Sequence, residues 1–181
     1  VMVEEACKGV AGVSASQVEI QSGIQLYDGI TTAEIQEILI KSASDLIDLD
    51  NPNYQFVAAR LLLFSVRKSL YGRCRDIPSL EDHIIKCVGQ EVYDAEIYDK
   101  YSKEDIEKAN GYIDHDRDFM FTYAGLRQVV DKYLVQDRST GQVYETPQFM
   151  YMMIALTIFA NYPKEKRLNY VRRYYNAISR H

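Results

Sequence analysis

The chain has 181 residues, of which 47% are hydrophobic, and a formal charge of −5 at pH 7. This length is enough for the core of one ordinary domain or of two small ones. Lysine and arginine are scattered, which argues against a broad basic surface for a nucleic-acid backbone. The longest strongly apolar stretch, 149–160, is shorter than the roughly 20 residues that cross a bilayer, so it predicts a buried helix and no membrane span.

The three cysteines are Cys7, Cys74 and Cys87. Their odd number and wide separation fit neither a disulfide framework nor a zinc or redox C-x-x-C pair, so we expect a reducing, cytoplasmic environment. No secretion signal is apparent at the N-terminus. Residues 1–7 instead have the pattern of the middle of a helix that lacks its first turn. We therefore expect further residues upstream.

Helical patterns dominate the first part of the chain. Ser14–Gln17 has capping-box spacing and begins a short helix that Asp28-Gly29 ends. Thr31–Glu34 has the same spacing and begins an amphipathic helix. Asn51-Pro52 supplies a cap and a first turn for a third helix, which Tyr71-Gly72 ends. The apolar pattern of that third helix covers more than one face, which predicts a central position.

Residues 73–78 are polar and irregular and mark the expected boundary between two parts of the chain. Helices are expected beyond it at about 79–89, at about 103–111 with Ser102 as its cap, and at about 117–130.

The pattern then changes from helical to alternating. Residues 133–145, with Gly141 at the tip, predict a β-hairpin. Thr146-Pro147 begins a helix that must end before Pro163, and apolar residues at helical spacing over 168–178 predict a last helix.

The cluster 114–118 contains three aspartates and a histidine, and could be either a metal loop or a structural cap. It lacks the glycine and the terminal glutamate of an EF-hand, so we favour capping and ion pairing. His83 and His181 are isolated in the sequence, and no nucleophile–histidine–acid trio can be assembled around either. We assign the 15 tyrosines to the core and to interfaces.

Thr31 and Thr32 lie where a glycine-containing turn meets a helix N-terminus, a place at which free N–H groups can hold a phosphate. Arg67-Lys68, late in the next helix, could supply a cation. Each residue also has an ordinary explanation, as a helix cap or as a partner of the helix dipole. The spacing alone leaves both interpretations open.

From Leu26 onward the sequence resembles the large subunit of class Ia ribonucleotide reductases. The motifs that carry the resemblance are YDGITTAEIQEILIKSA (27–43), PNYQFVAARLLLFSVRKSLYG (52–72), IDHDRD (113–118), KYLVQDRSTGQVYETPQF (132–149) and NYPKEKRLNYVRRYYNAIS (161–179). Their order and separation match the family as well as their content does.

The resemblance implies that residues 1–72 form an ATP-cone, a helical domain that binds ATP to activate the enzyme and dATP to inhibit it. The β-hairpin that opens this domain in the family is absent here. Thr32 and Lys68 match nucleotide-binding positions of the family, and Gln36 stands where bacterial relatives often have a histidine that helps the domain respond to the nucleotide sugar. Glutamine can donate and accept hydrogen bonds but cannot become a cation.

Residues 73–181 resemble the helical segment before the ten-stranded barrel that holds the active site in this family. We therefore predict a mainly α chain with one β-hairpin, from an enzyme that reduces ribonucleoside diphosphates for DNA synthesis. In the family a small di-iron–tyrosyl (beta) subunit supplies the radical, thioredoxin or glutaredoxin supplies electrons, and the large subunit associates with itself. None of the three cysteines matches a catalytic one, so this chain alone should be inactive and bind no cofactor beyond the effectors ATP and dATP.

Two other hypotheses stay open. The first is a stand-alone nucleotide sensor, like the ATP-cone repressors of reductase genes, although their CxxC…CxxC zinc ribbon is missing here. The second is a purely structural helical interaction module with no ligand, which weak binding of ATP to a version with a complete N-terminus would favour.

Overall fold

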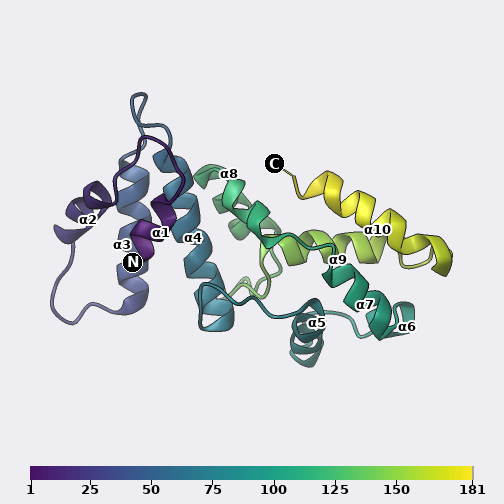
Figure 1. Ribbon diagram of the computed structural model, residues 1–181. Helices are drawn as coiled ribbons and strands as arrows, with labels where there is room; N and C mark the ends of the chain where they lie inside the picture. Colours follow the sequence, from purple (N-terminus) through teal and green to yellow (C-terminus); the bar gives the residue numbers. More distant parts are fainter. Residues whose placement is uncertain (181) are drawn as a thin grey trace. The chain divides into compact units, whose positions relative to one another are not determined.

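A computed structural model describes residues 1–180 and confirms a mainly helical chain with almost no strand (Figure 1). His181, predicted to be isolated, lies outside the described residues. Within the described part, no helix is both long and apolar enough to cross a membrane. The chain forms two compact units: unit 1 is 1–74 with 119–132, and unit 2 is 75–118 with the segment from 133 onward.

Unit 1 is built around one central helix, α4, which packs against α1, α3 and α8. Residues 61–64 of α4 are all buried, as expected for a helix that is apolar on more than one face. The helices of unit 1 are α1 (Met2–Cys7), α2 (Ala15–Gly23), α3 (Thr32–Asp45), α4 (Tyr54–Tyr71) and α8 (Tyr123–Gln128).

The predicted starts of these helices are confirmed in part. The capping box of α3 forms as predicted, since Thr31 Oγ1 accepts from the Glu34 N–H at 3.2 Å and the Glu34 carboxylate accepts from the Thr31 N–H at 2.8 Å. Ser14 precedes α2 but makes no side-chain cap. The predicted start of α4 at Asn51-Pro52 was wrong, because the Asp48 carboxylate accepts from the Asn51 N–H at 2.7 Å and holds it in the preceding loop.

A helix over 117–130 was also predicted and does not form as one piece. A 3-10 turn (His115–Met120) is followed by an extended Thr122, whose Oγ1 accepts from the Gly125 N–H at 3.2 Å and begins α8 anew. Phe119 fixes this segment to α4: its ring lies 6.0 Å from the ring of Phe64 and 5.2 Å from the guanidinium of Arg67. Residues 119–132 therefore belong to the same compact unit as the first helices, whose own segment ends at Cys74.

Unit 2 packs α5 against α7, α9 against α10, and α10 against α7. Ser79 and Ser102 cap α5 and α7 with their side chains, and α9 begins at Pro147 as predicted. The helices of unit 2 are α5 (Leu80–Gly89), α6 (Ile97–Lys100), α7 (Lys103–Asn110), α9 (Pro147–Phe159) and α10 (Lys164–Ile178).

The predicted β-hairpin is reduced to its turn and a single antiparallel bridge between Gln136 and Val143. Gly141 has the expected positive φ of 73°. The pairing stops early because the N–H of Val135 donates to Glu145 Oε1 at 2.8 Å and not to a backbone carbonyl of the opposite arm.

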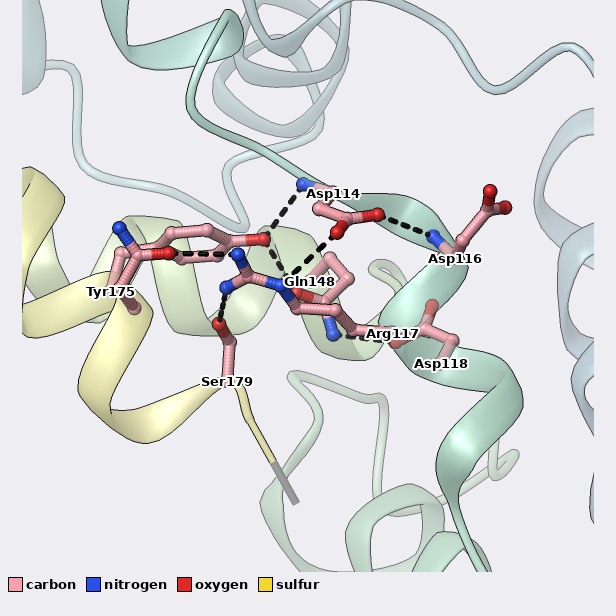
Figure 2. Close-up of polar contacts among 8 residues, drawn as sticks. Asp114, Asp116, Arg117, Asp118, Gln148, Tyr175 and Ser179 are labelled. Carbon is pink, nitrogen blue, oxygen red and sulfur yellow. Dashed lines mark hydrogen bonds and ion pairs between the residues drawn. The ribbon is translucent and has the colours of Figure 1, made fainter.

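The cluster 114–118 is a structural hub of unit 2 (Figure 2). The hydroxyl of Tyr175, on α10, accepts from the Asp114 N–H at 2.9 Å and donates to Gln148 Oε1, on α9, at 2.6 Å. The amide nitrogen of Gln148 in turn donates to Asp118 Oδ1 at 2.9 Å. One continuous chain of hydrogen bonds thus joins three segments distant in sequence.

Arg117 adds a second connection from the same cluster to α10. Its guanidinium donates to Ser179 Oγ at 2.5 Å and to Asn176 Oδ1 at 2.7 Å, and pairs with Asp114 Oδ2 at 3.3 Å. No group of three potential metal ligands occurs among the described residues. The expected ion pairing of the cluster is confirmed by the Arg117–Asp114 contact, whereas the helix that it was expected to cap is replaced by a 3-10 turn.

Gly72→Ala should destabilise unit 1 by about 1 kcal/mol, because the residue after α4 has φ of +73° and a side chain there is strained although no atom lies within 4 Å. Gly23→Ala, at the end of α2, has equally open space but no positive φ and should be neutral or stabilising. Urea unfolding followed by circular dichroism measures both. If the two variants lose the same free energy of unfolding, the positive φ of Gly72 is not what stabilises the end of α4.

Tyr175→Phe should destabilise the protein by about 1–3 kcal/mol, because it leaves the buried Gln148 Oε1 and the part-buried Asp114 N–H without their partner. Tyr174→Phe is the matched control, since no hydrogen bond of its hydroxyl occurs among the described residues. Its effect should stay within about 0.5 kcal/mol. Thermal unfolding of the two variants gives the comparison, and similar losses would show that the hub is dispensable.

Candidate functional site

The three candidate site residues lie at one end of the α3–α4 helix pair. These helices are consecutive, packed against each other and joined by residues 46–53, so they run antiparallel (Figure 1). Ser65 Oγ donates to Gln36 Oε1 at 3.4 Å and sets their register. Thr32 lies one turn before Gln36 on α3, and Lys68 lies one turn after Ser65 on α4. Tertiary packing thus gathers residues that are up to 36 positions apart.

The start of α3 leaves backbone donors available. The capping box occupies the N–H groups of Thr31 and Glu34, while those of Thr32 and Ala33 have no acceptor within the helix. They point out of the positive end of the helix dipole, and the Thr32 side chain is exposed. This end of α3 can therefore donate hydrogen bonds to an anion.

A fixed negative charge limits where such an anion can lie. Hydrogen bonds from the side chain and N–H of Thr31, and then from the Tyr27 hydroxyl, lower the pKa of Glu34 and keep it a carboxylate. A phosphate would be repelled on that side of the helix start and favoured on the side that faces α4.

Two further donors lie on the α4 side. The Nε2 atom of Gln36 is buried and has no hydrogen-bond partner among the described residues. Lys68 is half-buried, and no ion pair to its ammonium occurs in the described part of the chain. A buried amide donor without an acceptor is costly, so a ligand that accepts from it would be stabilised. Together these groups suit a polar anionic ligand.

A second polar cluster, in unit 2, was missed in the sequence. His83, predicted to be isolated, is buried and stacks on the Phe149 ring at 4.2 Å. Its Nε2 lies 3.1 Å from the Tyr93 hydroxyl and 3.7 Å from Cys87 Sγ, and the Tyr93 hydroxyl donates to Glu145. The i, i+4 spacing of His83 and Cys87 was visible in the sequence, but the contacts with the other two residues depend on the tertiary fold.

This cluster is unsuited to nucleophilic catalysis. Burial, followed by the charges of Lys86 and His115, lowers the pKa of His83 to about 4, and burial raises the pKa of the Cys87 thiol to about 11. At neutral pH the imidazole is therefore uncharged and the thiol keeps its proton, so no thiolate forms. The cluster fills the core of unit 2 with mutually satisfied polar groups.

Comparison with known proteins gives consistent matches. The family model described as ribonucleotide reductase, all-alpha domain, matches residues 119–181. The chain is 47% identical to ribonucleoside-diphosphate reductase 1 subunit alpha of Escherichia coli (strain K12) over 178 residues, which cover 98% of the chain and 23% of that protein. It is 49% identical over 174 residues to the subunit alpha of Haemophilus influenzae, covering 96% of the chain and 23% of that protein.

The subunit alpha of Enterobacteria phage T4 is 45% identical over 170 residues, which cover 93% of the chain and 22% of that protein. The chain thus spans less than a quarter of the length of the relatives that it matches. The matched region includes both compact units, and the motifs of 27–43 and 52–72 fall inside it as well as those of 113–179. The chain therefore belongs to the ribonucleotide reductase large-subunit family and corresponds to the N-terminal part of its class Ia-like alpha subunit.

Proposed function

We propose that this chain is the allosteric nucleotide-binding region of an enzyme that reduces ribonucleoside diphosphates to deoxyribonucleoside diphosphates, with ATP as activator and dATP as inhibitor. The names of the relatives support the reductase activity. In this proposal residues 1–72 are the ATP-cone and the helical segment 73–181 precedes the catalytic barrel.

The observation that carries the nucleotide site is the set of donors at the α3–α4 end. The N–H groups at the start of α3 and the ammonium of Lys68 are suitable partners for phosphate oxygens. The hydroxyl of Thr32 can accept from or donate to a ribose hydroxyl or a phosphate. The buried Nε2 of Gln36 is a further donor that the protein itself leaves without an acceptor.

ATP and dATP differ only by the ribose 2′-hydroxyl, so their opposite effects require that they stabilise different arrangements of the domain or of its contacts. Gln36 is our proposed reporter of that difference, because its amide can both donate and accept without a change of charge.

The reduction itself would take place outside this chain. Cys7, Cys74 and Cys87 are all free in the described structure. The designation alpha in the relatives' names implies a beta subunit. We propose that this partner delivers a radical from a di-iron–tyrosyl centre, that thioredoxin or glutaredoxin supplies electrons, that the alpha subunit associates with itself, and that the enzyme works in the cytoplasm.

The stand-alone sensor is a weaker alternative. The reductase all-alpha model matches residues 119–181, beyond the proposed cone, and the alignment with reductase alpha subunits runs over 98% of the chain. A repressor that shared only the cone would not share this second region.

Lys68→Met in the complete subunit should weaken ATP binding about tenfold to a hundredfold, the value of one charge-assisted hydrogen bond. Lys41→Met is the control, because Lys41 lies near the other end of α3 and pairs with Asp45. Isothermal titration with ATP measures both affinities. An unchanged affinity of Lys68→Met would remove this residue from the site.

Gln36→Leu should leave the stability of the unliganded subunit nearly unchanged, because the residue contributes a buried donor that has no partner in the described structure and one long hydrogen bond of 3.4 Å. The rise in melting temperature on adding ATP or dATP should become smaller, and the two nucleotides should become harder to distinguish. Thermal shift assays with each nucleotide provide the test. A full nucleotide response in Gln36→Leu would exclude an interaction of the ligand with this amide.

A further inference from the structure

The side chain of Phe119 is held by one face of α4. Its ring lies 6.0 Å from the ring of Phe64, in an edge arrangement, and 5.7 Å and 5.2 Å from the guanidiniums of Arg60 and Arg67. Positions 60, 64 and 67 are separated by four and three residues, so they form one stripe along the helix. A second ring and two cations therefore fix the position of the Phe119 ring.

The same turns of α4 carry residues of the proposed nucleotide site on another face. Ser65, which donates to Gln36 of α3, directly follows Phe64, and Lys68 directly follows Arg67. Neighbouring residues of an α-helix point about 100° apart, and the helix between them is stiff. A ligand that draws Lys68 towards the start of α3 therefore also moves the side chains that hold the Phe119 ring.

Asp118, the residue before Phe119, is anchored in unit 2. Its side chain is buried, and its Oδ1 accepts from Gln148 Nε2 at 2.9 Å within the hub that also contains Tyr175 (Figure 2). The chain passes from unit 2 to unit 1 at the peptide bond between residues 118 and 119. Consecutive Cα atoms are only about 3.8 Å apart, so no slack lies between the two anchored side chains. A displacement of Phe119 therefore acts on the hydrogen bonds of the hub.

The other end of the segment 119–132 is less constrained. After α8 the chain forms a π-helical turn, η2 (Val129–Tyr133), in which no residue is buried, and it enters unit 2 again at Tyr133. A π-helix has i→i+5 hydrogen bonds and is rare. Because nothing in this turn is buried, a change in its hydrogen bonding disturbs little packing. The segment thus has one fixed end, at Phe119, and one end that can yield.

We propose that Phe119 couples the nucleotide site of unit 1 to the hydrogen-bond hub of unit 2. Nucleotide bound at the α3–α4 end changes the position of Phe119 on α4, and the peptide bond to Asp118 carries that change to the contacts of Gln148 and Tyr175. Phe119 does not touch the nucleotide and acts as a positioning residue. The proposal rests on the proposed nucleotide-binding function and adds the route by which binding reaches the second unit.

The Asp114 N–H is a natural probe of the hub, because it donates to Tyr175 and its hydrogen exchange reports the opening of that contact. In the complete subunit, saturating ATP should change the exchange rate of a peptide that contains Asp114 by about fivefold or more. Phe119→Ala should abolish this change, whereas Phe119→Tyr, which keeps the ring, should retain it. Met120→Ala is the positional control, since Met120 is 65% exposed, and it should respond fully.

A further variant assigns the effect to the α3–α4 end. At an ATP concentration that just saturates the unsubstituted subunit, Lys68→Met should give a smaller change in hub exchange, because it weakens that site. A full response of Lys68→Met would place the effect at another ATP site and overturns the proposal.

Isothermal titration separates the possible failures. Phe119→Ala should still bind ATP, because none of the proposed site residues is changed. A hub response that persists in Phe119→Ala overturns the coupling, and so does an unsubstituted subunit that binds ATP without a change in hub exchange; both results leave the nucleotide site standing. An unsubstituted subunit that does not bind ATP overturns the proposed nucleotide site, and the coupling with it.

Reciprocity provides a second measurement that does not depend on the folding of Phe119→Ala. If nucleotide binding alters the hub, weakening the hub must alter nucleotide binding. Tyr175→Phe should therefore change the ATP affinity of the complete subunit about fivefold, although Tyr175 belongs to unit 2. Tyr174→Phe, the matched control, should leave the ATP affinity unchanged. Equal ATP affinities of the two variants overturn the proposal.

Discussion

The buried hydroxyl of Tyr175 is the contact on which unit 2 depends most. It joins α10 to α9 through Gln148 and to the 113–118 motif through the Asp114 N–H. Burial raises the pKa of this phenol, so it keeps the proton that it donates to Gln148. An apolar contact could hold the same helices together, but it would leave an amide oxygen and a backbone N–H without partners, and that cost gives the network its specificity for one arrangement.

Unit 1 is organised by packing around α4. Its central residues are buried on several faces, and Phe119 brings the later segment against it through Phe64 and Arg67. The polar groups gather at the helix ends, where α3 begins and α4 stops. A rigid helix pair that presents donors at one end fits a regulatory site, because a ligand bound there can bias the domain without a reaction taking place.

Both units contain satisfied and unsatisfied buried polar atoms, and Thr146 Oγ1 and Arg167 Nε of unit 2 also make no hydrogen bond in the described structure. In unit 2 the His83, Tyr93 and Glu145 side chains form hydrogen bonds with one another. The lowered pKa of His83 results mainly from burial and does not indicate a catalytic role. In unit 1 the amide nitrogen of Gln36 is left without a partner in the described structure. A ligand that accepts from the lone Gln36 donor would satisfy it, and the position of Gln36 one turn after Thr32 is what supports the binding role proposed for unit 1.

Local sequence determined the features that depend on neighbouring residues: the capping box of Thr31, the stop of α4 at Gly72, the start of α9 at Pro147, and the family motifs. Each is decided within four or five residues by backbone geometry and hydrogen bonding. Tertiary structure alone decided that 119–132 joins the first unit, that the hairpin shrinks to one bridge, and that His83 meets Tyr93. These depend on contacts between residues ten or more positions apart, whose energies no local pattern records.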